Sequence, residues 1–127
     1  MAGEGTKPIV CLSAGGNDIG KVGSEELLRR FKEVLGKIRD KGGIPVVCGI
    51  LPRRSAGSMW HSTAIAMNCR VANHCKANGW AFVDSWDRFY GRDHLYARDG
   101  VHLSRFGVQA LADSLEKEVS TLRAFLG

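Results

Sequence analysis

Apolar and polar positions fall into blocks along the chain, and each block has the period of one kind of element. Three short, almost wholly apolar runs predict strands of a parallel sheet that is buried on both faces: 7–12, 44–51 and 80–84. Three longer segments repeat apolar residues at helical spacing: 24–41, 60–78 and 104–126. The strict alternation of strand and helix predicts an α/β fold, a three-layer α/β/α sandwich with a parallel sheet and right-handed crossovers.

The first predicted helix is amphipathic and strongly basic on its polar face. Ser24 is its predicted N-cap, with Glu25 and Glu26 in the first turn. Its apolar positions share one face: Leu27, Leu28, Phe31, Val34, Leu35 and Ile38. Lysines and arginines cover the rest between positions 29 and 41. Either a solvated helix face or a nucleic-acid patch fits these charges, and we expect the solvated face.

The other two predicted helices differ in how clearly their apolar faces are drawn. The helix that begins at Trp60 or His61 has a weak apolar face through Ile65, Cys69 and Ala72. The last helix carries a clean stripe that we expect to face the sheet: Val108, Leu111, Ala112, Leu115, Val119 and Leu122. An aromatic segment lies between them, and we expect it to pack beneath the following loop rather than to line a substrate pocket: Trp86, Phe89, Tyr90 and Tyr96.

Length and composition bound the organisation of the chain. Its 127 residues are enough for one domain with a real core, and 44% hydrophobic residues argue against disorder. We expect a loose N-terminus over 1–7 and one domain over 8–127. No apolar run reaches the ~20 residues of a membrane span, and no signal-peptide pattern opens the chain, so we expect a cytoplasmic location. The net charge of +5 favours anionic partners only weakly.

The cysteines show no pattern of a metal or redox site. None forms a Cys-x-x-Cys pair or has zinc spacing: Cys11, Cys48, Cys69 and Cys75. Buried free thiols are the expected state. The sequence therefore predicts no metal and no cofactor.

The segment 97–107, ARDGVHLSRFG, carries the most distinctive chemistry. Asp99 and His102 lie three residues apart, with a helix start directly after them. A carboxylate beside an imidazole holds the ring in one tautomer and stabilises the imidazolium that forms when the ring takes a proton. This spacing allows an Asp-His pair that activates a nucleophile. The alternative is that Asp99 caps a turn and His102 is an ordinary surface residue.

A second candidate lies after the first predicted strand. The segment 9–19, IVCLSAGGNDI, is an apolar run that ends in Asn17 and Asp18. Ligands of open α/β sheets bind at the carboxyl ends of the strands, where the Asn17 amide can donate a hydrogen bond to a developing oxyanion. An ordinary Asx turn at this position is an equally good interpretation.

Together these two segments resemble the SGNH (GDSL-type) hydrolase family. Residues 15–18 match its Gly-x-Asn-Asp block, and residues 99–102 match its Asp-x-x-His block, followed by Leu103 and Gly107. The resemblance covers about residues 8–122 and implies a flavodoxin-like fold that cleaves carboxylic esters. The wording of the blocks also looks, more loosely, like the esterase-like domain in the first open reading frame of non-LTR retroelements.

The resemblance implies a role for each matched residue. A serine attacks the ester carbonyl, His102 acts as general base and then as general acid, and Asp99 orients His102. Asn17 donates to the oxyanion, and Gly15 is the glycine of its block. The substrate implied is a small-molecule ester, with no cofactor.

The sequence departs from the family at the nucleophile. The Gly-Asp-Ser block and a following glycine block are absent, and none of the nine serines follows Gly-Asp. We therefore expect the later portion of an SGNH domain, truncated and inactive. Cys48 is no stand-in nucleophile, because it lies on the wrong strand for the family geometry.

Loss of the first strands has a consequence for association. The strand at 9–12 would have an uncovered edge, which predicts a homodimer or poor solubility. The alternative function is a non-catalytic association or nucleic-acid-binding module of retroelement origin, which rests on the basic helix at 29–41.

Overall fold

The fold is seen in a computed structural model that describes residues 7–13 and 16–126. Three parallel strands form one sheet in the order of the chain: β1 (Ile9–Ser13), β2 (Ile44–Cys48) and β3 (Ala81–Val83). Four α-helices accompany them: α1 (Ser24–Asp40), α2 (Ser58–Ala77), α3 (Trp86–Phe89) and α4 (Arg105–Leu126). Two single 3₁₀ turns complete the described elements: η1 (Gly16–Asp18) and η2 (Asp93–Leu95).

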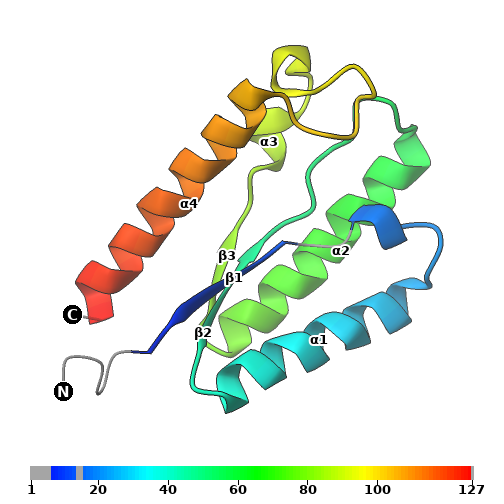
Figure 1. Cartoon of the computed structure of the whole chain (residues 1–127). Coiled ribbons are helices and arrows are strands. Elements are labelled where there is room, and N and C mark those ends of the chain that lie inside the picture. The colour runs from blue at the N-terminus through cyan, green and yellow to red at the C-terminus, as the bar shows by residue number, and fades with distance from the viewer. Residues whose placement is uncertain (1–6, 14–15, 127) are drawn as a thin grey trace.

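The elements form three layers. Helices α1 and α2 lie side by side on one face of the sheet, and α4 runs along the other face (Figure 1). Helix α3, η1 and the loops after β2 and β3 lie beyond the end of the sheet where the strands terminate (Figure 1). This confirms the predicted α/β sandwich with a parallel sheet.

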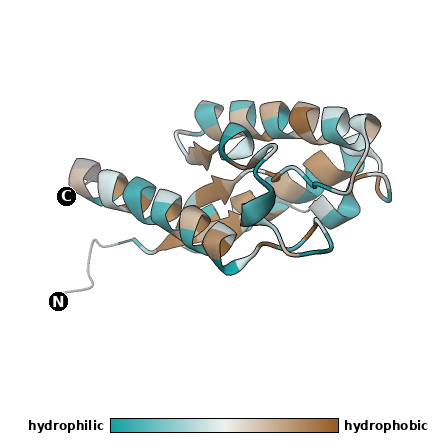
Figure 2. Cartoon of the chain, turned by 90° about the horizontal axis from the view of Figure 1, so that it is seen from above, coloured by the Kyte–Doolittle hydropathy of each residue, from teal (hydrophilic) through white to brown (hydrophobic). Residues whose placement is uncertain are grey.

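The larger core lies between the sheet and the helix pair α1–α2. It buries apolar side chains of all three elements, among them Leu35, Val47 and Met67. The strands are predominantly brown, that is hydrophobic, in the hydropathy colouring of Figure 2, whereas each helix alternates between brown and teal. A second, smaller cluster of Phe89, Leu95 and Tyr96 lies under the N-terminal end of α4.

Two of the element boundaries that differ from the sequence prediction have identifiable reasons. Ser24 is the first residue of α1 and not its cap, because the extended Gly23 takes the N-cap position without a side-chain hydrogen bond. The second strand stops at Cys48 rather than Leu51. Beyond it, the buried Asn68 side chain takes over the role of a neighbouring strand, since it accepts from the Ile50 N–H and donates to the Ile50 carbonyl.

The predicted apolar face of the second helix is wrong. Helix α2 begins at Ser58, two residues earlier than expected, and exposes Ile65 and Cys69. Its buried residues are instead Ala64, Met67, Asn68, Val71 and Cys75. Because the polar Asn68 lies at the centre of this buried face, a search for apolar periodicity does not find it.

The stripe of the last helix is rotated relative to the prediction. Val108 is 57% exposed and Ala112 is also exposed, while Leu111 and the later members of the stripe are half-buried. The rotation follows from Gly107, which is buried and lies directly against the backbone of η2. The face that meets the body of the protein therefore runs through positions 107, 110 and 111.

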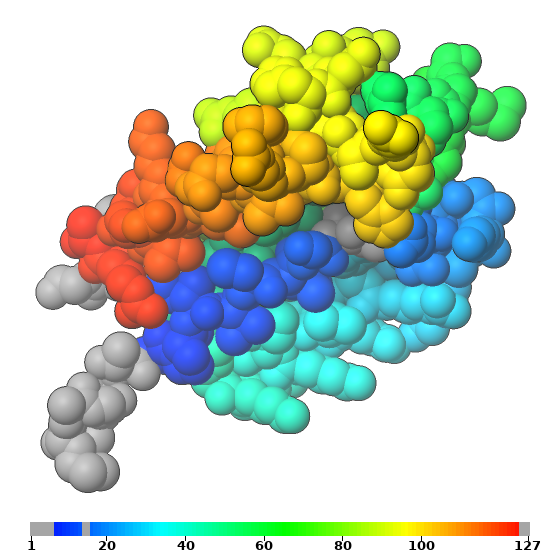
Figure 3. All heavy atoms as spheres, turned by 45° about the horizontal axis from the view of Figure 1, so that its top comes forward, coloured from blue at the N-terminus to red at the C-terminus, as the bar shows by residue number. Residues whose placement is uncertain are grey.

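Strand β1 is an edge strand of the described sheet. Its residues Val10, Cys11 and Ser13 are exposed, whereas Pro45 to Cys48 of β2 are all buried. The blue atoms of β1 are visible at the surface between α4 and α1 in Figure 3. The expectation of a fully buried first strand is thus wrong, and the expectation of buried thiols holds only for Cys48 and Cys75.

None of the helices in the described part is long and apolar enough to span a membrane.

Candidate active site

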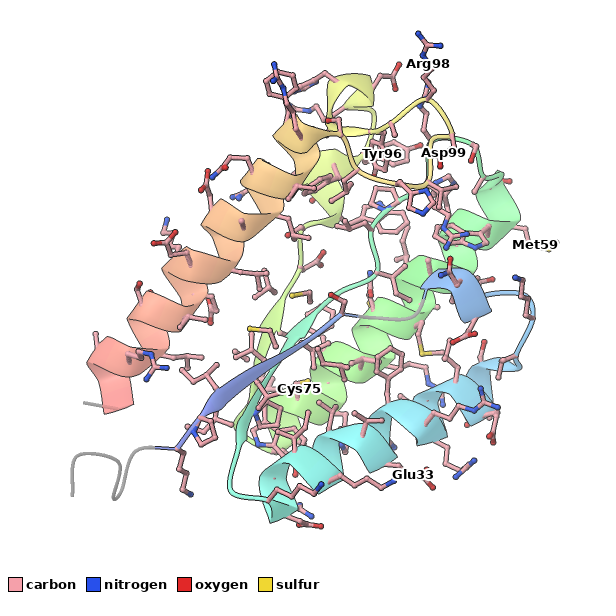
Figure 4. All side chains as sticks on the ribbon, in the orientation of Figure 1. Glu33, Met59, Cys75, Tyr96, Arg98 and Asp99 are labelled. Carbon is pink, nitrogen blue, oxygen red and sulfur yellow. The ribbon has the colours of Figure 1, made fainter. Side chains whose placement is uncertain are left out.

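Asp99 and His102 form a hydrogen-bonded pair on the loop between η2 and α4. The Oδ2 atom of Asp99 lies 2.5 Å from His102 Nδ1, and its Oδ1 atom accepts the backbone N–H groups of Val101 and His102, each at 2.9 Å. The same carboxylate therefore closes the turn and binds the ring. The labelled side chain of Asp99 lies on this loop in Figure 4.

These contacts determine the charge and the tautomer of the pair. The hydrogen bond from His102 and then the two backbone N–H groups hold the pKa of the Asp99 carboxyl well below its usual range. A carboxylate at Nδ1 requires the proton of a neutral imidazole to be on Nδ1, which leaves the Nε2 lone pair free to accept a proton. The His102 side chain is 80% exposed, so Nε2 is accessible.

The backbone fixes the loop that carries the pair. The Ala97 N–H donates to the His102 carbonyl at 2.8 Å, and Gly100 lies at φ = 71°, a conformation that favours glycine. A Cβ at Gly100 would also lie 2.9 Å from the Ser55 nitrogen, so the loop packs tightly on residues 54–55. Helix α4 then begins directly after Ser104, whose hydroxyl donates to the His94 carbonyl at 2.6 Å.

Asn17 lies in the η1 turn that follows β1. The turn is closed by backbone hydrogen bonds, from Ile19 to Gly16 and from Lys21 and Val22 to Asp18. The Asn17 side-chain oxygen accepts from Arg53 Nη2 at 2.5 Å, and the Ile19 N–H that an Asx turn would use donates to the Gly16 carbonyl, so Asn17 forms no Asx turn within the described residues. The block glycine Gly15 lies outside the described residues.

The two loops meet at one hollow of about 270 Å³ beyond the ends of β1 and β2. Asn17 and His102, which are far apart in the sequence, both line it. The wall also includes the segment 48–53 and four further residues: Ser13, Gly16, Val101 and Leu111. Asp99 reaches this hollow only through His102. The structure therefore brings together the predicted proton acceptor and the predicted oxyanion donor.

The segment 52–55 ties the two loops to each other, and sequence reasoning missed this role. Arg54 Nη2 donates to the carbonyls of Ala97 and Arg98 at 3.0 and 2.8 Å, and the Arg54 N–H donates to the Gly100 carbonyl at 2.8 Å. The Tyr96 hydroxyl donates to the Pro52 carbonyl. The only sequence signal is a Pro-Arg-Arg run at a strand end, which does not identify its partners.

The predicted aromatic segment divides into a buried and an exposed part. Phe89 and Tyr96 are buried beneath the Asp99–His102 loop and meet edge to face, with ring centroids 6.2 Å apart. Tyr90 is 60% exposed and stacks on Trp86. Phe89 and Tyr96 are thus buried as expected, although they also line a second hollow, and the expectation of packing is wrong for the exposed Tyr90.

Two other groups with nucleophilic atoms line the hollow. Burial, and to a smaller extent the neighbouring Cys11, raises the pKa of the Cys48 thiol to about 11, so at neutral pH it is not a thiolate. Ser13 ends β1 and is exposed. Among the described residues, neither side chain hydrogen-bonds to His102.

Comparison with known proteins identifies the fold and the family. The chain is 30% identical to the esterase domain of the ORF1 protein from the zebrafish ZfL2-1 retrotransposon, with a TM-score of 0.73 over 84% of this chain and 68% of that one. A GDSL-like lipase from Bacteroides thetaiotaomicron has the same fold at 16% identity, with a TM-score of 0.80 over 90% of this chain and 62% of that one. No curated protein matches the chain.

The chain thus spans between 62% and 68% of the length of these two solved structures. The sequence model of the GDSL-like lipase/acylhydrolase family matches residues 2–110, which is most of the chain. The match includes the Asn17 loop and the Asp99–His102 loop. The chain belongs to the GDSL-like lipase/acylhydrolase (SGNH) family.

Proposed function

We propose that residues 8–127 are the later portion of an SGNH ester-hydrolase domain and supply three of its catalytic groups: Asn17, Asp99 and His102. The observation that carries this proposal is that Asn17 and His102 line one hollow, with the imidazole held by Asp99. The substrate class is a carboxylic ester, and the reaction needs no cofactor.

The geometry is suited to acyl transfer. As a serine hydroxyl attacks the ester carbonyl, its proton passes to His102 Nε2. The carbonyl oxygen becomes an oxyanion, which accepts a hydrogen bond from Asn17 Nδ2. The imidazolium then gives its proton to the departing alkoxide, and an acyl-enzyme remains. Water repeats the sequence on the acyl-enzyme and releases the acid. Asp99 stays ionised throughout, because its pKa is low, and stabilises the imidazolium.

The nucleophile is the group that the 127 residues do not offer in the family's form, since none of their serines follows Gly-Asp. Removal of the serine from a serine hydrolase costs about a million-fold in kcat, with a residual contribution from the oxyanion hole and binding. We therefore propose that this chain by itself hydrolyses esters at or near the background rate.

The edge of β1 is where a further strand would join the sheet. Val10 of this strand is 37% exposed. An added strand would cover Val10 and pair the backbone edge of β1 that is open in the described sheet. We propose that this strand comes either from the same polypeptide or from a second copy in a homodimer.

The test is hydrolysis of p-nitrophenyl acetate by the purified chain beside His102→Ala, Asn17→Ala and Ser13→Ala. The proposal expects the same background rate for all four proteins and no burst of p-nitrophenol. A rate that falls in His102→Ala and Asn17→Ala would contradict the inactivity and would show that a nucleophile is present. If Ser13→Ala abolished that rate as well, Ser13 would be the nucleophile.

The alternative, a nucleic-acid-binding module, has weaker support. The arginines of α1 are paired within the helix: Arg29 with Glu26 and Glu33, Arg30 with Glu26, and Arg39 with Asp40. These pairs reduce the net positive charge that a polyanion would meet. Salt-dependent binding of single-stranded nucleic acid, lost when the basic residues of α1 are neutralised, would revive this alternative.

A further inference from the structure

Arg53 makes contacts that an ordinary exposed loop arginine does not make. Its Nη2 atom donates to Asn17 Oδ1 at 2.5 Å, across 36 residues of sequence. Its guanidinium lies over the Trp60 ring, 4.9 Å from the ring centroid. The side chain also lines the hollow that Asn17 and His102 share.

The hydrogen-bond chemistry of the two side chains fixes the direction of the Asn17 amide. A guanidinium can only donate, so the group of Asn17 that it meets must be the carbonyl oxygen Oδ1. The NH₂ group is then the other end of the carboxamide, and it has no hydrogen-bond partner among the described residues. Asn17 would otherwise be able to present either end to the hollow, and only the NH₂ end can donate to an oxyanion.

The surroundings hold Arg53 in this position. Trp60 supplies a flat platform on one side, with a cation–π contact. The backbone of Gly16 lies on another side, since a Cβ built there would be 3.4 Å from Arg53 Nη2. The next residue, Arg54, anchors the same segment to the carbonyls of Ala97 and Arg98. The guanidinium is thus part of a supported contact and not of a free loop.

We propose that Arg53 is a positioning residue that fixes the Asn17 carboxamide with its NH₂ group toward the hollow. A charged donor on the amide oxygen also polarises the amide and makes its N–H groups stronger donors. The consequence for catalysis rests on the proposed role of Asn17 as the oxyanion donor. The contact itself is independent of that role and can be measured without any activity.

A different role for Arg53 is to bind an acidic group of the substrate. In that case the guanidinium would be free of Asn17 in the empty protein, and its removal would leave the Asn17 amide unchanged. The two roles therefore predict opposite results for the spectrum of the Asn17 side chain.

The experiment is a ¹H–¹⁵N spectrum of the side-chain amides of the whole chain. The sequence has four asparagines and one glutamine, so the NH₂ region holds five pairs of signals, and Asn17→Ala assigns the relevant pair. The variants are Arg53→Met, which keeps length but removes all donors, and Arg53→Lys, which keeps one charged donor. The matched control is Arg98→Met, since Arg98 points away from the body of the protein (Figure 4).

We expect Arg53→Met to move the Asn17 Nδ2 signal to the position of Asn73, an exposed asparagine of α2, and to lower its heteronuclear NOE. Arg53→Lys should restore part of the shift, and Arg98→Met should leave the signal in place. An Asn17 signal that does not change in Arg53→Met overturns the proposal and leaves the ester-hydrolase assignment untouched.

A second variant covers the case in which Arg53→Met perturbs the fold, which the backbone amide spectrum would reveal. Trp60→Leu removes the platform and keeps the arginine. It should shift the Asn17 signal in the same direction by a smaller amount. The proposal would also be contradicted if the Asn17 signal stayed at its wild-type position in both Trp60→Leu and Arg53→Lys. Neither the ring platform nor the planar guanidinium, which a lysine lacks, would then be needed to hold the Asn17 amide.

Discussion

Gly107 is the position at which α4 touches η2, the turn before the Asp99–His102 loop. A Cβ built there would lie 2.0 Å from the Leu95 carbonyl oxygen and 3.1 Å from Leu103 Cβ. A carbon and a carbonyl oxygen normally stay about 3.3 Å apart, so Gly107→Ala requires the backbone to separate by about 1.3 Å. The Leu95 carbonyl also accepts the Ser104 N–H at 2.9 Å, and this bond would be strained or lost.

The magnitude follows from three contributions. Overpacking of a tight contact costs about 1–3 kcal/mol. The lost hydrogen bond costs about 1 kcal/mol, and the higher helix propensity of alanine returns about the same amount. The free energy of unfolding of Gly107→Ala should therefore fall by about 1–3 kcal/mol. For a domain of this length that corresponds to a fall in Tm of roughly 3–12 °C.

The matched control is Gly36→Ala in the middle of α1. A Cβ there meets only the flexible end of Arg39, at 3.9 Å, so this substitution should raise stability by about 0.5–1 kcal/mol. The assay is urea and thermal unfolding of both variants followed by circular dichroism. If Gly107→Ala is as stable as the wild type or more stable, the close contact of α4 with η2 is refuted.

Three further predictions concern other parts of the fold. Asn68→Leu should lower the free energy of unfolding by about 2 kcal/mol or more, because the buried N–H and carbonyl of Ile50 lose their partners. The control Asn73→Leu, on the exposed face of α2, should change the free energy of unfolding little. Urea unfolding measures both variants. Hydrogen bonds from Arg29 and, more weakly, Arg30 lower the pKa of Glu26 from 4.5 to about 2, so its stabilising contribution is complete above pH 4.5 and is lost as the pH falls toward 2. Glu26→Gln should therefore lose less stability than the wild type between pH 6 and pH 2, and equal losses would contradict the pairing. A thiol reagent should label the exposed Cys11 and Cys69 rapidly in the folded protein. It should label the buried Cys48 and Cys75 only after unfolding.

The parts of the site that sequence predicts are those in which the partners are close in the chain or are related by the sheet. Asp99 and His102 lie in one turn, so their spacing alone indicates a contact. Asn17 follows a parallel strand, and the carboxyl ends of neighbouring parallel strands meet at one edge. Both inferences use local pattern and topology, which a sequence displays directly.

The remaining features depend on long-range contacts of polar groups. Arg53 and Arg54 find partners 36 and 43 residues away, and nothing in their spacing distinguishes them from solvated loop residues. Asn68 is buried because its amide hydrogen-bonds to the backbone of Ile50, which lies beyond the end of β2. A search for apolar residues therefore does not identify position 68 as a core position. The altered faces of α2 and α4 have the same origin, since Asn68 and Gly107 carry no hydrophobic signal.

The most direct test of the account is to add a nucleophile in the Gly-Asp-Ser form of the family. The chain is fused behind a designed segment that contains a strand ending in Gly-Asp-Ser, and hydrolysis of p-nitrophenyl acetate is measured. The account predicts a rate above that of the chain alone, lost in His102→Ala and in the Ser→Ala variant of the added block, and strongly reduced in Asn17→Ala. A fusion protein that folds, shown by circular dichroism and a single Tm, and whose rate does not respond to His102→Ala would contradict the assignment of Asn17, Asp99 and His102 to one ester-hydrolysing site.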